Sequence, residues 1–187
     1  MDRGRSERLG REAWVAAAFR ALARRGIEAV GVEPVAKALG VTKGSFYWHF
    51  RDRRALLEAL LAHWSERETA AIIADVEAIP GPPALQLKRL FERALSDGDA
   101  LGPELAIRDW ARRDPVARKA VLAVDARRLA YLVRLFLPLS AGPAEAEAKS
   151  ALAYGLLIGE WTIFRQESAL ARAKRRRRAL DLLARKS

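Results

Sequence analysis

The segment from Val32 to Arg54, VEPVAKALGVTKGSFYWHFRDRR, constrains the fold of this chain more than any other. Pro34 suits a first helical turn, where its missing N–H has no intrahelical partner, and Gly40 suits the left-handed residue that closes a helix. Thr42 can cap a second helix by accepting a hydrogen bond from a backbone N–H two or three residues further on. Two short helices joined this tightly must cross at a steep angle, so the segment predicts a helix-turn-helix.

Basic and aromatic side chains crowd the second helix of this pair. Tyr47, Trp48 and His49 are consecutive, and three successive helical residues span about 200 degrees, so they cannot all face one core. All three carry N–H or O–H donors of the kind that fix a recognition helix on phosphate oxygens. Lys43 and Ser45 stand near the helix start, where such a helix meets base edges. The alternative is a basic, aromatic surface turn that binds no ligand.

The segment VTKGSFYWHFRDRRALL resembles the recognition helix and the following helix of the tetracycline-repressor (TetR) family of bacterial transcriptional regulators. The resemblance extends loosely over the whole chain, but its motifs map residue by residue only in about the first third. It implies DNA contacts by Thr42, Lys43, Gly44, Ser45, Tyr47, Trp48, His49 and Arg53. Of these, Lys43 and Ser45 would sit at base edges, and Arg53 would hold a phosphate from the start of the next helix.

Apolar periodicity and helix breakers predict an all-α chain of about nine helices. Outside the helix-turn-helix, the expected helices span residues 11–25, 53–78, 84–96, 103–112, 115–137, 143–166 and 168–185. Asp52 is the expected N-cap of the long second one. The chain then divides into a three-helix DNA-binding head, residues 1–52, and a helical bundle, residues 53–187, which by the resemblance binds a ligand and dimerises.

The resemblance also implies a small-molecule cavity in the helical bundle. Candidate lining residues are Trp64, Phe91, Trp110, Tyr131, Glu160, Trp161 and Phe164, although large aromatics at helical spacing also fit a plain core. Glu160 lies in an otherwise apolar stretch. Its carboxylate is expected either to pair with a base such as Arg134 or Arg165, or to meet a polar group of a ligand.

Two glycines four residues apart, Gly155 and Gly159, allow a close helix approach, either within one subunit or between subunits. The resemblance implies a homodimer in which the last two helices of each subunit form a four-helix bundle. Candidate interface residues are Leu152, Gly155, Leu156, Gly159, Ile163, Leu180 and Leu183. Pairing two heads would let them read major grooves about 34 Å apart on a pseudo-palindromic operator.

The net charge of +11 is concentrated at the two ends of the chain. Residues 1–60 hold 12 Lys or Arg against 7 Asp or Glu, and residues 172–187 hold 8 against 1. A basic N-terminal third fits polyanion binding, because neutralising phosphates releases condensed counterions. The run from Lys174 to Arg178 fits a nucleic acid or anionic membrane surface, or a solvated helix face that borders an apolar stripe. The resemblance assigns it no DNA contacts.

Several classes of function and location are not expected. The chain has no cysteine, which excludes disulfides and thiolate chemistry and suits a reducing cytoplasm. The first residues are charged, without the apolar run of a signal peptide, and no stretch approaches twenty uninterrupted apolar residues, so we expect a cytoplasmic protein without a membrane span. Only two histidines, His49 and His63, are present, and no phosphate-binding glycine loop, so we expect no enzyme, metal or cofactor.

We therefore expect a sequence-specific transcriptional regulator, a repressor that a small-molecule effector releases from its operator. The alternative is a nucleoid-coating or membrane-surface protein that binds polyanions through charge alone.

Overall fold

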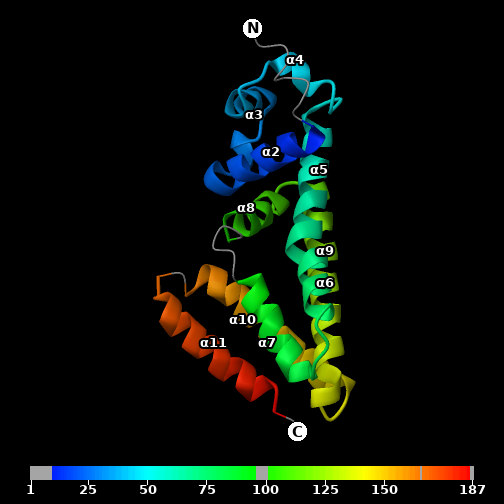
Figure 1. The fold of residues 1–187 in the computed structure, drawn as a ribbon, viewed down its shortest axis with the longest axis vertical. Coiled ribbons are helices and arrows are strands. Elements are labelled where there is room, and N and C mark those ends of the chain that lie inside the picture. The colour runs from blue at the N-terminus through cyan, green and yellow to red at the C-terminus, as the bar shows by residue number, and fades with distance from the viewer. Residues whose placement is uncertain (1–9, 96–100, 165, 186–187) are drawn as a thin grey trace. The chain divides into compact units, whose positions relative to one another are not determined.

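The computed structural model describes residues 10–95, 101–164 and 166–185, and over these residues the fold is all-α, as the sequence predicts. The elements are α2 (Arg11–Arg25), η1 (Ile27–Ala29), α3 (Val32–Leu39), α4 (Lys43–Phe46), α5 (Arg53–Ser65), η2 (Glu66–Ala70), α6 (Ala71–Glu77), α7 (Pro83–Ala94), α8 (Leu101–Ala111), α9 (Pro115–Phe136), η3 (Leu137–Leu139), α10 (Pro143–Thr162) and α11 (Ala169–Leu183). With α5, η2 and α6 taken as one interrupted helix, the described residues form the expected nine helices (Figure 1).

The helices form two compact units. The first unit comprises residues 1–67 and 99–122, and the second comprises residues 68–98 and 123–187. In the first unit α2 packs on α3, α5 and α8. In the second unit α7 packs on α6 and α11, and α10 packs on α11. The functional division at residues 52 and 53 remains a prediction, since compactness groups the helices by packing and not by role.

Local caps explain where the helices of the first unit begin and end. Gly40 has φ +68°, and Val41 N–H donates to the Ala36 carbonyl at 3.0 Å, the pattern that closes α3 with a left-handed glycine. Asp52 caps α5, because its Oδ1 accepts from the Ala55 N–H at 2.8 Å. Thr42 occupies the N-cap position of α4, but its side chain makes no cap hydrogen bond, so that expectation is wrong in its chemistry.

The core of the first unit is aromatic near α4. The Trp14 and Phe46 rings meet edge to face with centroids 5.3 Å apart, and Phe46 stacks on Phe50 at 5.4 Å. Trp14 and Phe46 are fully buried and Phe50 nearly so. Edge-to-face and stacked rings of this kind add to the free energy gained by burying their area. One helical turn, α4, is thereby held firmly although it is too short to be stable alone.

Candidate DNA-reading surface and ligand cavity

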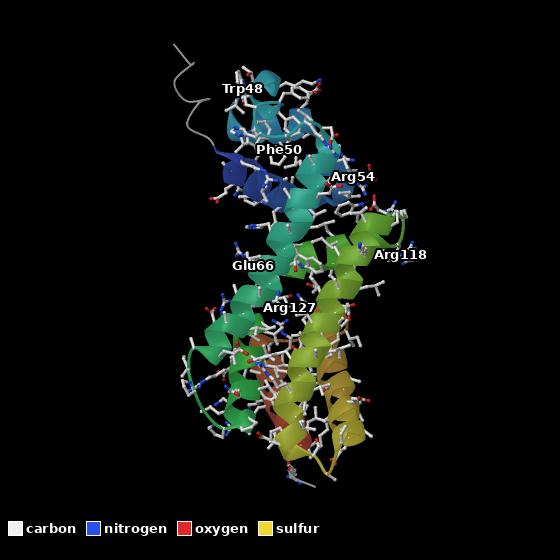
Figure 2. The ribbon with its side chains drawn as sticks, turned by 90° about the vertical axis from the view of Figure 1, so that its right-hand side faces the viewer. Trp48, Phe50, Arg54, Glu66, Arg118 and Arg127 are labelled. Carbon is white, nitrogen blue, oxygen red and sulfur yellow. The ribbon has the colours of Figure 1, made fainter. Side chains whose placement is uncertain are left out.

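The exposed side of α4 and its following turn carries most of the residues expected to meet DNA. Phe46 points into the core, while Tyr47 is 57% exposed and Trp48 is 87% exposed. Figure 2 shows Trp48 at the α3–α4 end of the first unit, beyond the buried Phe50. Thr42 and Lys43 are also exposed, and His49 is half-buried. We call the exposed side chains of Thr42, Lys43, Tyr47 and Trp48 the α4 surface.

Lys43 is paired within the first unit. Its Nζ donates to Glu33 Oε1 on α3 at 2.8 Å, and both side chains are exposed. The hydrogen bond and the charge of Glu33 raise the pKa of Lys43, and the same pair lowers the pKa of the Glu33 carboxyl. An exposed pair of this kind contributes little to stability, so Lys43 can exchange Glu33 for another acceptor at low cost.

Ser45 does not lie on the outer face, contrary to expectation. The residue is only 6% exposed, and its Oγ has no hydrogen-bond partner among the described residues. Since α4 is a single turn, its rotational phase cannot be read from a repeating apolar pattern. Ser45 is therefore wrongly placed at base edges by the sequence.

Arg53 is committed to the backbone of its own unit. Its Nε donates to the Val30 carbonyl at 2.6 Å and its Nη2 donates to the Ile27 carbonyl at 3.1 Å. These bonds join the start of α5 to η1 and satisfy carbonyls at the end of a short helix. Only the Nη1 edge of the guanidinium lies outside these bonds, so the principal contacts of Arg53 are structural.

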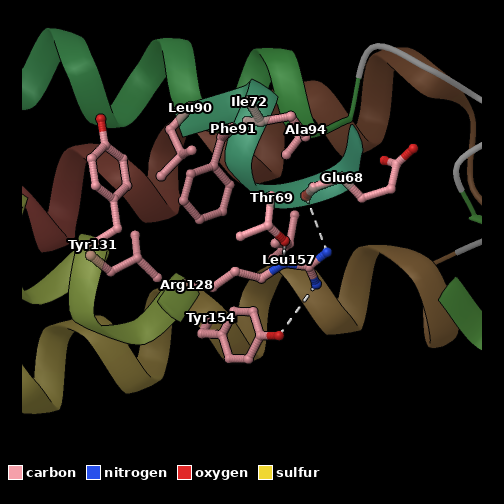
Figure 3. A pocket seen from close by; sticks show the side chains of 11 residues that line it. Glu68, Thr69, Ile72, Leu90, Phe91, Ala94, Arg128, Tyr131, Tyr154 and Leu157 are labelled. Atoms are coloured by element: carbon pink, nitrogen blue, oxygen red, sulfur yellow. Dashed lines mark hydrogen bonds between the residues drawn. The ribbon is translucent and has the colours of Figure 1, made fainter. Parts of the chain in front are cut away.

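A cavity of about 40 Å³ lies in the second unit (Figure 3). Its apolar lining comes from Ile72 of α6, from helices α7 and α9, and from Leu157 of α10. The complete lining is Glu68, Thr69, Ile72, Leu90, Phe91, Ala94, Arg128, Tyr131, Leu132, Tyr154 and Leu157. An apolar cavity with a few converging polar groups is the usual form of a small-molecule site.

Polar contacts of the cavity converge on Arg128 of α9. Its Nε donates to Thr69 Oγ1 at 3.0 Å, its Nη1 to Tyr154 Oη at 3.4 Å and its Nη2 to the Glu68 carbonyl at 3.2 Å. Tyr154 Oη in turn donates to Asp125 Oδ1 at 2.5 Å. At the other side of the cavity Tyr131 Oη is buried without a hydrogen-bond partner among the described residues, and burial raises the pKa of this phenol against the opposing effect of nearby Arg134.

Of the seven residues expected at a ligand cavity, Phe91 and Tyr131 line the one described here. Trp64 and Trp110 are buried in the first unit, where Trp64 Nε1 donates to Glu104 Oε2 at 3.1 Å. The side chain of Trp161 lies outside the described residues.

Glu160 and Phe164, the other two candidates, share a partner on α11. Glu160 is buried and pairs with Arg175 Nη2 at 3.4 Å, while the Arg175 guanidinium lies 3.4 Å from the centroid of the Phe164 ring. The ion-pair interpretation of Glu160 is thus confirmed, but with a different base. Arg134 pairs instead with Glu77, and Arg165 lies outside the described residues. The basic run is consequently not a free tail, because Arg175 within it holds α11 to the end of α10.

The expected interface residues differ in exposure. Leu152 is 64% exposed and Ile163 is 73% exposed, and a Cβ on Gly155 would meet nothing within 4 Å. Gly159 is buried, and a Cβ there would make ordinary contact with the Phe164 ring at 3.4 Å. Leu180 is buried, whereas Leu156 and Leu183 are half-buried. Leu152, Gly155 and Ile163 thus form an apolar strip along α10 and its C-cap that the described residues leave uncovered.

Sequence reasoning missed Arg128, Thr69 and Tyr154. Arg128 interrupts an otherwise apolar stripe formed by Val121, Val124, Leu132 and Leu135 along α9, all buried. A cation on the buried side of a helix needs partners, and that interruption was the available signal. Glu33 was missed because its pairing with Lys43 depends on the crossing of α3 and α4.

The described residues hold neither a cluster of metal ligands nor a helix suited to a membrane. No group of three or more His, Cys, Asp or Glu side chains there is arranged to hold a metal ion. None of the helices in these residues combines the length and the apolar character that crossing a membrane requires.

Comparison with known proteins finds relatives among bacterial regulators. Residues 15–60 match the family model described as bacterial regulatory proteins, tetR family. The chain is 31% identical over 81 residues to the HTH-type transcriptional regulator AcrR of Shigella flexneri, covering 42% of this chain and 36% of AcrR. It is 40% identical over 53 residues to the tetracycline repressor protein class D of Escherichia coli, covering 28% of this chain and 24% of that repressor. These matches thus span about a third or less of the relatives' length.

The fold itself extends the likeness over nearly the whole chain. A transcriptional regulator from Rhodococcus sp. Rha1 superposes with a TM-score of 0.76 at 24% identity, covering 93% of each chain. At that identity the superposition establishes the shared fold and nothing about ligands. Residues 15–60 thus resemble the tetR family of bacterial regulatory proteins, and the all-helical fold over nearly the whole chain is shared with a solved transcriptional regulator.

Proposed function

We propose that this protein is a transcriptional regulator that binds operator DNA through the α4 surface. The observation that carries the proposal is the contrast within α4 and its turn, where Phe46 is fully buried and Trp48 is 87% exposed. A large aromatic is costly to leave in water, and here it projects from a turn that a packed aromatic core holds in place. Such a rigid, donor-bearing projection is suited to a DNA groove and its phosphates.

The contacts divide between base reading and positioning. Lys43, at the first turn of α4, is the proposed base-reading residue, since a lysine commonly bonds guanine O6 and N7. A Cβ added at Gly44 would meet only Thr42 Oγ1, at 3.8 Å, so this position faces open space. The absence of a side chain there would let the DNA surface approach the backbone closely. The side chains of Thr42, Tyr47, Trp48 and His49 are proposed to meet phosphates. Arg53 could reach a phosphate only through Nη1, and Ser45 is not proposed as a contact.

Operator binding is proposed to be controlled from the second unit. The cavity of the second unit is proposed to hold a small-molecule effector that lowers operator occupancy, so that the protein acts as a repressor. An effector can shift the protein only by its difference in affinity between DNA-competent and incompetent conformations. The uncovered strip of α10 supports a homodimer, which would present two α4 surfaces to a pseudo-palindromic site. On this proposal residues 1–52 read DNA and residues 53–187 bind effector and partner.

A fluorescence-anisotropy titration tests the DNA-binding proposal. The full chain is titrated with a duplex from its own upstream region and with a scrambled duplex, at physiological salt. We expect the wild type to prefer the upstream duplex. Lys43→Ala should reduce that preference by about tenfold, whereas Tyr47→Phe, which removes one hydroxyl, should weaken both duplexes equally. Equal affinity of the wild type for both duplexes would reject sequence-specific binding and favour a protein that coats any polyanion.

A further inference from the structure

The long helix from Arg53 to Glu77 is interrupted by the π-turn η2, Glu66–Ala70. Most abrupt breaks in a helix are caused by proline, by glycine or serine pairs, or by an inserted side chain. The sequence of this turn, ERETA, contains no proline or glycine. π-turns are rare and cluster at functional sites. The looser winding at η2 therefore requires contacts made by other elements.

Arg128 supplies those contacts. Its Nε bonds the Thr69 side chain and its Nη2 bonds the Glu68 backbone carbonyl, so one guanidinium grips two successive residues of the π-turn (Figure 3). Thr69 is 2% exposed and Arg128 is 9% exposed. Hydrogen bonds from a charged donor in so buried a place are stronger than neutral ones. We call this set of contacts from Arg128 to Glu68 and Thr69 the π-turn latch.

The latch forms one wall of the cavity. Glu68, Thr69 and Arg128 all line it, and beyond them the lining is mainly apolar. The cavity of about 40 Å³ has room for only a few water molecules, since holding one takes about 10–15 Å³ of such space. A larger molecule can enter only if part of the wall gives way. The latch is the polar part, and its bonds can be exchanged for bonds to a ligand.

We propose that the effector is a compact, uncharged, largely apolar molecule with a carbonyl oxygen, which takes the Arg128 hydrogen bond from the Glu68 carbonyl and lets η2 rewind toward α-helical register. This inference rests on the proposed effector cavity but adds the chemistry of the ligand and the element on which it acts. In α-helical register the Glu68 carbonyl accepts from the backbone N–H four residues further on, a bond that does not depend on Arg128.

Charges around the latch exclude the ionised alternatives. Asp125 accepts from Tyr154, which itself contacts Arg128, so a negative charge already lies near the guanidinium. An anionic ligand would add a negative charge near Asp125 in a poorly solvated place, and a cationic ligand would be placed against Arg128 itself. A neutral carbonyl satisfies the guanidinium without either cost.

A matched ligand series tests the proposal on the full chain without DNA. The probes are cyclohexanone, cyclohexanecarboxylate and cyclohexylamine, followed by calorimetric titration and by hydrogen–deuterium exchange. We expect cyclohexanone to bind at least tenfold more tightly than either ion, and to slow amide exchange in residues 66–71. Stronger binding of either ion, no binding of cyclohexanone up to its solubility limit, or unchanged exchange in that segment would each overturn the proposal.

Two variants examine the latch itself. Arg128→Lys keeps the charge but loses the planar fork, and should weaken cyclohexanone binding about tenfold, the change expected for one hydrogen bond to a charged group. Thr69→Val keeps the shape but removes the acceptor of Nε, and should tighten cyclohexanone binding severalfold, because rewinding of η2 would otherwise also have to break the bond from Nε to Thr69. If Arg128→Lys does not fold, Thr69→Val still decides the question, and unchanged affinity there rejects the latch.

Thr162→Val is the matched control, because it makes the same chemical change at an exposed residue of α10 whose Oγ1 bonds only the Ile158 carbonyl at 2.9 Å. It should leave cyclohexanone affinity at the wild-type value, and an effect equal to that of Thr69→Val would reject the latch. DNA binding is read separately. Failure of the wild type to prefer its upstream duplex counts against the regulator, whereas the ligand and exchange results judge the latch alone.

Discussion

At the scale of single residues, the most informative contact is the pair formed by Lys43 and Glu33. Glu33 accepts a hydrogen bond from the Lys43 amino group, which is proposed to read a base. Base reading by Lys43 would therefore have to break the 2.8 Å bond from Lys43 Nζ to Glu33 Oε1. Both side chains are exposed, so water replaces each partner readily. Glu33 therefore weakens any competing contact of Lys43 slightly, and it also places a negative charge beside the α4 surface.

Replacing Glu33 by Gln should raise DNA affinity about two- to fivefold for all duplexes, since it removes both the competitor and a repulsive charge. Anisotropy titration at two salt concentrations would measure the change, which should shrink at the higher salt. Glu28→Gln is the control, because it removes an equal charge from an exposed position of the same unit that does not pair with Lys43. Equal gains in the two variants would mean that net charge alone is responsible.

His63 gives the first unit a pH dependence. Its ring meets the Phe19 ring edge to face at 5.3 Å, and burial, followed by the nearby charge of Arg67, lowers its pKa, while Glu12 raises it. The depressed pKa means that the unfolded chain binds the proton more readily than the folded one. The contribution of His63 to the free energy of unfolding is thus fully present above the ordinary histidine pKa of about 6.5. It is lost as the pH falls through that value toward the lower pKa of His63 in the folded chain.

Thermal unfolding of the wild type should accordingly begin at a lower temperature at pH 5.5 than at pH 7.5. His63→Gln should remove part of this difference, because glutamine does not titrate. The carboxyl of Asp114, whose pKa is lowered, loses its contribution only at more acidic pH and does not interfere. A wild-type difference that survives unchanged in His63→Gln would assign the pH dependence to other groups.

At the scale of elements, Asp114 joins the start of α9 to α5. Its Oδ1 accepts from the Val116 and Ala117 N–H groups at 2.8 and 2.9 Å, and its Oδ2 accepts from Arg54 Nη1 at 2.9 Å. The Ala117 N–H and then Arg54 are the main causes that lower the pKa of this carboxyl. One side chain thus caps a helix and ties it to the helix that follows the α4 surface.

We expect Asp114→Ala to lower the free energy of unfolding by about 1–2 kcal/mol, the usual cost of losing a cap, and Asp114→Asn to cost less because the amide oxygen can still cap α9. Urea denaturation of both variants, with and without Arg54→Ala, forms a double-mutant cycle that isolates the ion pair. If the alanine and asparagine variants are equally destabilised, the ion pair and not the cap is the larger contribution.

Sequence patterns predict those elements whose limits are set by local chemistry. The first helix ends at Gly26 and α5 begins after Asp52, because a glycine and a capping carboxylate act within their own turn. The same reasoning predicted one continuous helix to residue 78 and missed the π-turn. No residue at positions 66–70 signals a break, since the contacts that accompany it come from Arg128, about sixty positions away. Tertiary contacts also decided the phase of α4 and hence the burial of Ser45.

At the scale of the whole molecule, the uncovered strip of α10 is the proposed site of self-association. Leu152 and Ile163 are among the most exposed large apolar side chains of the described residues, and Gly155 between them leaves room for a close backbone approach. Exposed apolar residues aligned along one helix commonly mark a protein interface. A homodimer formed there would bury them symmetrically, since a twofold interface uses the same surface on both copies.

A charge introduced into this strip should separate the two copies. Leu152→Glu would place two carboxylates near the twofold axis of the proposed dimer, so we expect at least a hundredfold weaker self-association by analytical ultracentrifugation. Binding to a full pseudo-palindromic duplex should weaken, while binding to a half-site stays as it was, because the α4 surface is unchanged. Leu122→Glu provides the matched control, since Leu122 is 63% exposed, like Leu152 at 64%, but belongs to α9. If the dimer persists in Leu152→Glu, or dissociates equally in Leu122→Glu, the interface does not lie on α10.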